Sequence, residues 1–160
     1  MSEPWTLINI DGQPRPLRFN GAAFRDFEMA YARSIGVPEY PFGKVIARYF
    51  EPSTNFEVVT SYNLLAHLVW AGLKWRWQTL TVEMAMHVLS DFEEKGGDLL
   101  TDVWGPLSQA WIATGMFKHL IKRVDDEARP GNRDAETKTP GSDSPSSASV
   151  SAAGTSAQPE

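Results

Sequence analysis

The fold is decided by the stretch from Tyr62 to Leu89, YNLLAHLVWAGLKWRWQTLTVEMAMHVL. Apolar residues recur in its first half at spacings of three and four, which predicts one broad apolar face on a helix. These residues are Leu64, Leu65, Leu68, Val69 and Leu73. Trp70 and Ala71 widen the face until little polar surface remains, so the helix is expected to be enclosed by other elements.

A second helix is predicted to begin at Val82. Gly72 weakens the first helix, residues 73–78 (LKWRWQ) form a connection, and the Thr81 hydroxyl caps the next helix. That helix carries a narrower apolar stripe, made of Val82, Ala85, Met86, Leu89 and Phe92. The stretch is therefore a helical hairpin with a tryptophan-rich corner.

Composition divides the chain at residue 125. Residues 125–160 contain no Leu, Ile, Phe, Trp, Tyr or Met, and Val150 is their only larger aliphatic residue. Such a segment buries too little apolar surface to offset the entropy lost on ordering. We therefore predict a helical domain over residues 1–124 and a disordered, acidic, Ser/Pro/Ala-rich tail over residues 125–160.

Charge and cysteine content narrow the class of partner. Residues 1–124 hold 12 Lys and Arg against 13 Asp and Glu, and the tail holds 3 against 7. A near-neutral body with an acidic tail argues against nucleic acid as the partner. The absence of cysteine excludes disulfides and thiolate metal sites. Since neither a secretion signal nor a long apolar run is found, we expect a soluble cytoplasmic protein with no membrane partner.

Residues 5–19 (WTLINIDGQPRPLRF) predict a β-hairpin with Asp11-Gly12 as its two-residue turn. The register pairs Ile10 with Gln13, Asn9 with Pro14, Ile8 with Arg15 and Leu7 with Pro16. In this register the N–H that each proline lacks would have pointed to the outer side of the second strand, away from the first strand. The ladder is kept, and that outer edge is blunted against pairing with another chain.

The remaining segments read as helices. Asn20 is expected to cap a helix over Ala22–Ser34 that ends at Gly36, and a short helix is expected over Phe42–Phe50. Ser53, Thr54 and Asn55 are candidate caps for the central helix. A last helical pattern runs from Leu99 to Val124 and is kinked or restarted at Pro106. The predicted class is mainly α: a small helical bundle with an N-terminal β-hairpin and a disordered C-terminal tail.

The order of these features resembles the phage tail assembly chaperones of long-tailed bacteriophages and related prophages. The strand pair IDGQPRPLRFN is followed by AAFRDFEMAYARSIG, then by LLAHLVWAGLKW with its W-A-G-L core at Trp70–Leu73. T-x-E at Thr81–Glu83 opens the next helix, and a final amphipathic helix leads into a polar tail. Two features depart from the family pattern: the second proline of the second strand and the tryptophan-rich connection after Trp75.

The resemblance implies a small helical protein made in the bacterial host cytoplasm. It would bind the long, largely helical tape-measure protein and keep it soluble until tail-tube subunits polymerise around it. A second partner that the resemblance allows is the tail-tube protein. It would be absent from the mature virion. The family often makes a second, frameshifted product, which a protein sequence cannot reveal.

Six residues are the candidate partner-binding set: Trp70, Leu73, Trp75, Arg76, Trp77 and Met84. Tryptophan supplies large contact area and methionine repacks easily, which suits an apolar helical partner. The alternative is that one or both of Trp75 and Trp77 fold back over their own core, with Arg76 stacking or solvated, and that one of Met84 and Met86 is a core residue.

No catalytic or cofactor site is predicted. His67, His87 and His119 share no i, i+4 spacing, so each is expected to be structural rather than a metal ligand. Asp125, Asp126 and Glu127 open the tail as solvated charge. No phosphate loop appears, and Ser and Asp are plentiful only in the tail. We therefore expect neither an enzyme nor a cofactor or metal.

Two other functions stay open. One is a virion structural protein or head–tail completion protein, which would be abundant in purified particles. The other is a helical adaptor unrelated to phage, which a tape-measure gene beside this one would exclude.

Overall fold

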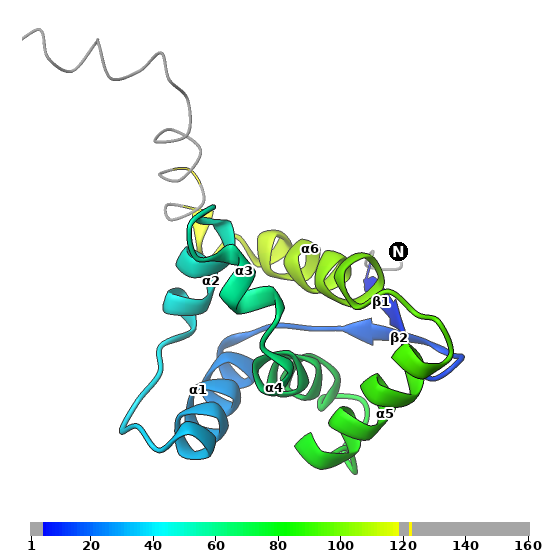
Figure 1. Ribbon diagram of the computed structural model, residues 1–160. Coiled ribbons are helices and arrows are strands. Elements are labelled where there is room, and N and C mark those ends of the chain that lie inside the picture. Colours follow the sequence, from blue (N-terminus) through cyan, green and yellow to red (C-terminus); the bar gives the residue numbers. More distant parts are fainter. Residues whose placement is uncertain (1–4, 119–121, 123–160) are drawn as a thin grey trace, which may run out of the picture. The chain divides into compact units, whose positions relative to one another are not determined.

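Helices make up most of the described chain, as the computed structural model in Figure 1 shows. The structure describes residues 5–118 and residue 122. The elements are β1 (Thr6–Asn9), β2 (Pro14–Leu17), α1 (Gly21–Ile35), α2 (Phe42–Phe50), α3 (Asn55–Val59), α4 (Tyr62–Leu73), α5 (Val82–Glu94), the π-helical turn η1 (Leu99–Trp104) and α6 (Gly105–Thr114). The mainly helical class with an N-terminal β-hairpin is confirmed. The chain divides into the units Met1–Val124 and Asp125–Glu160. The predicted disordered tail, residues 125–160, lies outside the described residues.

α4 is the central helix. Nine of its 12 residues are buried, because α1 and α5 pack along its sides and β2 crosses it. An apolar surface around nearly the whole helix requires such enclosure. The Ser61 hydroxyl caps it by accepting a hydrogen bond from the Leu64 N–H at 3.3 Å.

The predicted caps of this helix are wrong, because the short helix α3 intervenes before α4. The side chains of Thr54 and Asn55 instead satisfy carbonyl groups at the end of α2. Thr54 donates to the Arg48 carbonyl at 2.8 Å, and the Asn55 amide donates to the Tyr49 carbonyl. These two residues therefore close the preceding helix rather than open the central one.

The hairpin has the predicted register. Leu7 lies opposite Pro16, Ile8 opposite Arg15 and Asn9 opposite Pro14. Ile8, Ile10 and Leu17 are buried, with β1 against α6 and β2 against α4. A two-stranded sheet is marginal alone, so these helices supply the apolar surface that stabilises it.

Gly72 lies inside α4, beside the point where the chain leaves β2. The N–H of Arg18 donates to the Gly72 carbonyl at 2.9 Å. A Cβ atom at residue 72 would lie 2.8 Å from the Phe19 ring and 2.9 Å from Leu17 Cδ2. The glycine therefore permits a close approach of strand and helix, and the helix continues through it to Leu73.

The C-terminal helices follow the predicted signals in part. Thr81 caps α5, its hydroxyl accepting from the Met84 N–H at 3.1 Å, and Pro106 stands in the first turn of α6. α6 then ends at Thr114, because Gly115 adopts a left-handed φ of 68°. The predicted continuous pattern beyond Thr114 is therefore wrong at Gly115, and its end at Val124 lies outside the described residues.

Aromatic rings fill the space between α1, α2 and the last helices. Phe42 lies 4.4 Å from Phe24 and 5.5 Å from Trp111, measured between ring centroids. Trp104 and Trp111 are each 1% exposed. The Trp104 indole N–H donates to the Val59 carbonyl at 3.2 Å, which ties η1 to the end of α3.

Candidate functional site

The predicted tryptophan-rich corner exists, and the β-hairpin is part of it. Trp75, in the α4–α5 connection, stacks on Trp5 with 5.2 Å between ring centroids. Its indole N–H donates to the Pro16 carbonyl at 3.1 Å. We use "tryptophan corner" for four tryptophans and the four cations beside them: Trp5, Trp70, Trp75, Trp77, Arg15, Arg18, Lys74 and Arg76.

A cation lies over every tryptophan ring of the corner. The Arg15 guanidinium carbon is 3.8 Å from the Trp77 ring centroid, and Lys74 Nζ is 4.8 Å from that of Trp70. Arg18 lies 5.8 Å from the Trp5 centroid and 5.4 Å from the Trp75 centroid, and Arg76 lies 5.9 Å from Trp75. Each contact lies within the range of cation–π attraction, so the corner is an ordered aromatic surface edged with positive charge.

Two of these cations also have acidic partners. Arg15 Nε donates to the Asp11 carboxylate at 2.8 Å, and Lys74 Nζ donates to that of Asp26 at 2.8 Å. The hydrogen bond from Arg15 is the main reason why the pKa of Asp11 lies below its ordinary value. Arg18 and Arg76 form no ion pair and donate no side-chain hydrogen bond to any residue between 5 and 118 or to residue 122.

The six predicted residues divide by exposure. Trp75 and Trp77 are half-buried: Trp77 packs against the core, whereas Trp75 stacks on Trp5, and Arg76 is exposed. Met84 is 39% exposed on α5, and Met86 packs against the core. Trp70 is half-buried and donates to the Leu80 carbonyl at 3.0 Å.

Leu73 is placed differently from the other five. It is only 2% exposed and forms the floor of a cavity of about 210 Å³ between β2 and the connection. It supports the corner from beneath and offers a partner little surface.

Trp5 and Leu7 were missed by the sequence analysis. They are 39% and 53% exposed on the outer face of β1. The predicted hairpin register could have identified them, because residues i and i+2 of a strand lie on the same face. With Ile8 facing inward, Trp5 and Leu7 had to face outward.

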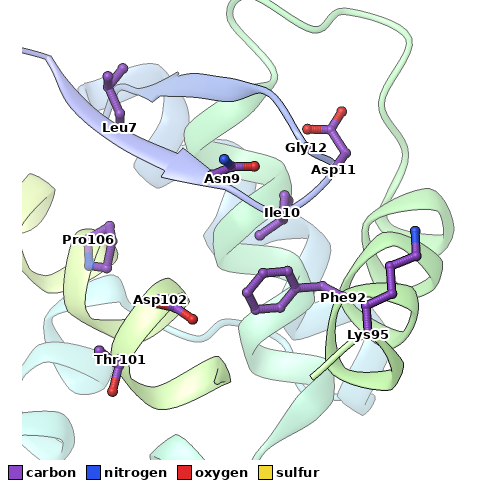
Figure 2. A pocket seen from close by; sticks show the side chains of 10 residues that line it. All are labelled: Leu7, Asn9, Ile10, Asp11, Gly12, Phe92, Lys95, Thr101, Asp102 and Pro106. Atoms are coloured by element: carbon purple, nitrogen blue, oxygen red, sulfur yellow. The ribbon is translucent and has the colours of Figure 1, made fainter. Parts of the chain in front are cut away.

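A second hollow lies along the free edge of β1. It has a volume of about 640 Å³, and Figure 2 shows Leu7, Asn9 and Ile10 across from Phe92 and Pro106. Lys95, Thr101 and Asp102 supply polar groups. The Asp11 carboxylate is bound to Arg15, and that of Asp102 accepts from the Asp98 N–H at 3.2 Å. The groove thus offers an apolar wall and a strand edge rather than a pair of carboxylates arranged for acid–base chemistry.

Two of the three histidines, His67 and His87, lie in the described part of the chain. His67 is buried in α4, where its Nδ1 lies 2.8 Å from the Asn63 carbonyl and its ring meets Tyr31 edge-on. His87 is exposed on α5. His119 and residues 125–127 lie outside the described residues. Among the residues described, no three His, Cys, Asp or Glu side chains are placed to hold a metal ion.

Comparisons of this chain with family models, with curated proteins and with solved structures give no match. Within residues 5–118, no helix combines the length and apolarity needed to span a membrane. What the chain does must therefore be inferred from its surface chemistry and from the order of its elements.

Proposed function

We propose that the chain is a phage tail assembly chaperone, a non-enzymatic protein that binds a tape-measure protein and keeps it soluble until the tail tube polymerises. The observation that carries the proposal is the ordered set of motifs that resembles this family. These motifs fall on β1–β2, on α1 ending at Gly36, on α4 with W-A-G-L at Trp70–Leu73, and on the start of α5 at Thr81–Glu83.

The tryptophan corner supports the proposal as a contact surface. A tape-measure protein presents apolar helical faces before the tube covers them, and an apolar surface that receives such a helix shields it from aggregation. Trp5 is exposed, Trp75 and Trp77 are half-buried, and Met84 is 39% exposed on α5. Large aromatic groups and an adaptable methionine are well suited to this contact.

Co-expression tests the proposal. The tape-measure protein encoded beside this chain is produced alone and together with it, and the soluble fraction is measured by quantitative blotting. We expect the tape-measure protein to be insoluble alone and soluble, in a complex with this chain, when both are made. Equal insolubility in the two cultures would contradict the proposal.

A pair of variants tests the surface. Trp5→Ala removes an exposed ring of the corner, and Phe56→Ala removes a ring that is 75% exposed on α3. Trp5→Ala is expected to lower the soluble tape-measure fraction severalfold, and Phe56→Ala to leave it unchanged. Circular dichroism melting verifies that both variants fold. A larger effect from Phe56→Ala would place the contact elsewhere.

Mass mapping of purified particles tests the transient role. A chaperone is expected to be missing from mature virions while the tape-measure protein is present in them. Abundant copies of this chain in particles would instead support a virion structural protein or a head–tail completion protein.

A further inference from the structure

We infer that the tryptophan corner recognises carboxylates: it fits a helical partner segment that carries Asp or Glu beside apolar side chains. The identification of that segment with part of a tape-measure protein rests on the proposed function. The chemistry of recognition rests on the corner itself.

The ion pairs of the corner leave an excess of positive charge. Among its four cations, Arg15 is paired with Asp11 and Lys74 with Asp26, each at a nitrogen–oxygen distance of 2.8 Å. Arg18 and Arg76 are exposed and have no acidic partner among residues 5–118 and 122. The described part of the chain holds 11 Lys and Arg against 12 Asp and Glu, so this local excess of two contrasts with a nearly neutral body.

Geometry brings the two unpaired guanidinium groups to one ring. They lie 5.4 and 5.9 Å from the centroid of Trp75. Contact with the ring restrains a long side chain, while the guanidinium N–H groups stay unused within the described structure. Arginine held in this way donates two parallel hydrogen bonds to a carboxylate, which is the strongest hydrogen-bonding pair available at an exposed site.

Apolar surface adjoins these donors. Arg18 also lies over Trp5, and Trp5 and Leu7 are 39% and 53% exposed on the same face of the hairpin. A ligand that only carried charge would leave these groups uncovered. A ligand that was only apolar would bury two guanidinium groups without a partner, which is costly. The two features together require a segment with both acidic and apolar side chains.

Two matched peptides test the inference directly. One is a 20-residue amphipathic helix of Leu and Ala whose polar positions are Glu, and the other has Lys at those positions. Each is labelled and titrated with the full chain, and binding is followed by fluorescence anisotropy. We expect the Glu peptide to bind at least about tenfold more tightly, and its affinity to fall as NaCl rises from about 50 to 500 mM. Equal affinity for the two peptides would overturn the inference.

Paired variants locate the effect. Arg18→Gln with Arg76→Gln is expected to weaken binding of the Glu peptide about tenfold or more. Arg25→Gln with Arg33→Gln removes two exposed cations from α1 and is expected to change it less than twofold. Equal losses in both pairs would overturn the inference as a statement about the corner. The salt titration of the wild-type chain decides the matter even if the first variant folds poorly.

The outcomes separate this inference from the proposed function. If the chain solubilises a tape-measure protein but shows no preference for the Glu peptide, the inference fails and the proposed function stands. If the preference holds while the tape-measure protein stays insoluble, the corner still recognises carboxylates and the proposed function fails. Concentration-dependent self-association that Arg18→Gln with Arg76→Gln abolishes would identify a second copy as the occupant and overturn the inference.

Discussion

Gly72 lies where β2 crosses α4, and its hydrogen atom occupies space that no larger side chain could enter. A methyl group there would lie 2.8 Å from the Phe19 ring and 2.9 Å from Leu17 Cδ2. We expect Gly72→Ala to lower the free energy of unfolding by about 1–3 kcal/mol, because the Phe19 ring and the Leu17 side chain must shift. Urea titration measures this. Gly21→Ala is the control, since nothing lies within 4 Å of its Cβ position; an equal effect of both changes would contradict the close approach.

Trp104 and Trp111 are buried alike but differ in their hydrogen bonds. The Trp104 indole N–H donates to the Val59 carbonyl, while that of Trp111 has no partner among the described residues. Replacement by Phe removes similar volume from both sites, so the difference isolates the hydrogen bond. We expect Trp104→Phe to destabilise the chain by about 1 kcal/mol more than Trp111→Phe, measured by urea titration. A greater loss at Trp111 would contradict this hydrogen-bond assignment.

The stability of the hairpin turn is expected to depend on pH through Asp11. The hydrogen bond from Arg15 is the main cause that lowers its pKa below the ordinary value of 3.8. The pKa of Asp11 is lower in the folded state than in the unfolded state. The stability that its pairing with Arg15 contributes is therefore complete above the unfolded pKa of about 3.9 and is lost as the pH falls through the folded pKa.

The variant Asp11→Asn is therefore expected to be less stable than the wild type at pH 7, by about 1 kcal/mol or less for a largely exposed pair. The difference should shrink below about pH 4. Urea titrations at pH 7, 5 and 3 measure it, and a difference that grows on acidification would contradict the pairing.

At the scale of elements, the two edges of the hairpin differ. Pro14 and Pro16 carry no N–H, and the Pro16 carbonyl accepts from Trp75, so the edge of β2 is closed. In an antiparallel ladder the N–H groups of non-hydrogen-bonded residues point away from the partner strand. Those of Asn9 and Leu7, which lie opposite the two prolines, are therefore expected at the outer edge of β1, and both residues line the groove of Figure 2.

Amide hydrogen exchange followed by NMR tests this asymmetry. We expect the Ile8 amide to exchange at least about tenfold more slowly than those of Leu7 and Asn9, because the register places Ile8 opposite Arg15 at a hydrogen-bonding position and the other two at non-bonding positions opposite prolines. Similar protection of all three amides would mean that the β1 edge is covered.

Turn residues and apolar spacing in the sequence predicted those elements that depend on interactions between near neighbours in the chain. The hairpin register followed from Asp11-Gly12 and apolar alternation, and α2 has the predicted bounds Phe42–Phe50. The separate short helix α3 was missed, and Thr54 and Asn55 bond back to carbonyl groups of α2 instead of capping α4. The outward face of Trp5 could be read from the register, but its stacking on Trp75 could not, because 70 residues separate the two rings in the sequence. Contacts between distant segments leave no periodic pattern in a sequence.

At the scale of the whole molecule, the described unit combines an enclosed helix with one aromatic, positively charged corner. The hairpin rests on the helices through Ile8, Ile10 and Leu17, while its outer face carries Trp5 and Leu7. The same small sheet therefore completes the core and presents the surface to which we assign partner binding.

Hydrogen exchange of the intact chain, measured by mass spectrometry with and without the co-expressed tape-measure protein, tests whether the tryptophan corner is the partner-binding surface. We predict that peptides covering residues 5–18 and 74–77 gain protection in the complex, while those covering α3 around Phe56 are unchanged. Protection confined to α3 or α6, with none at the tryptophan corner, would contradict the account.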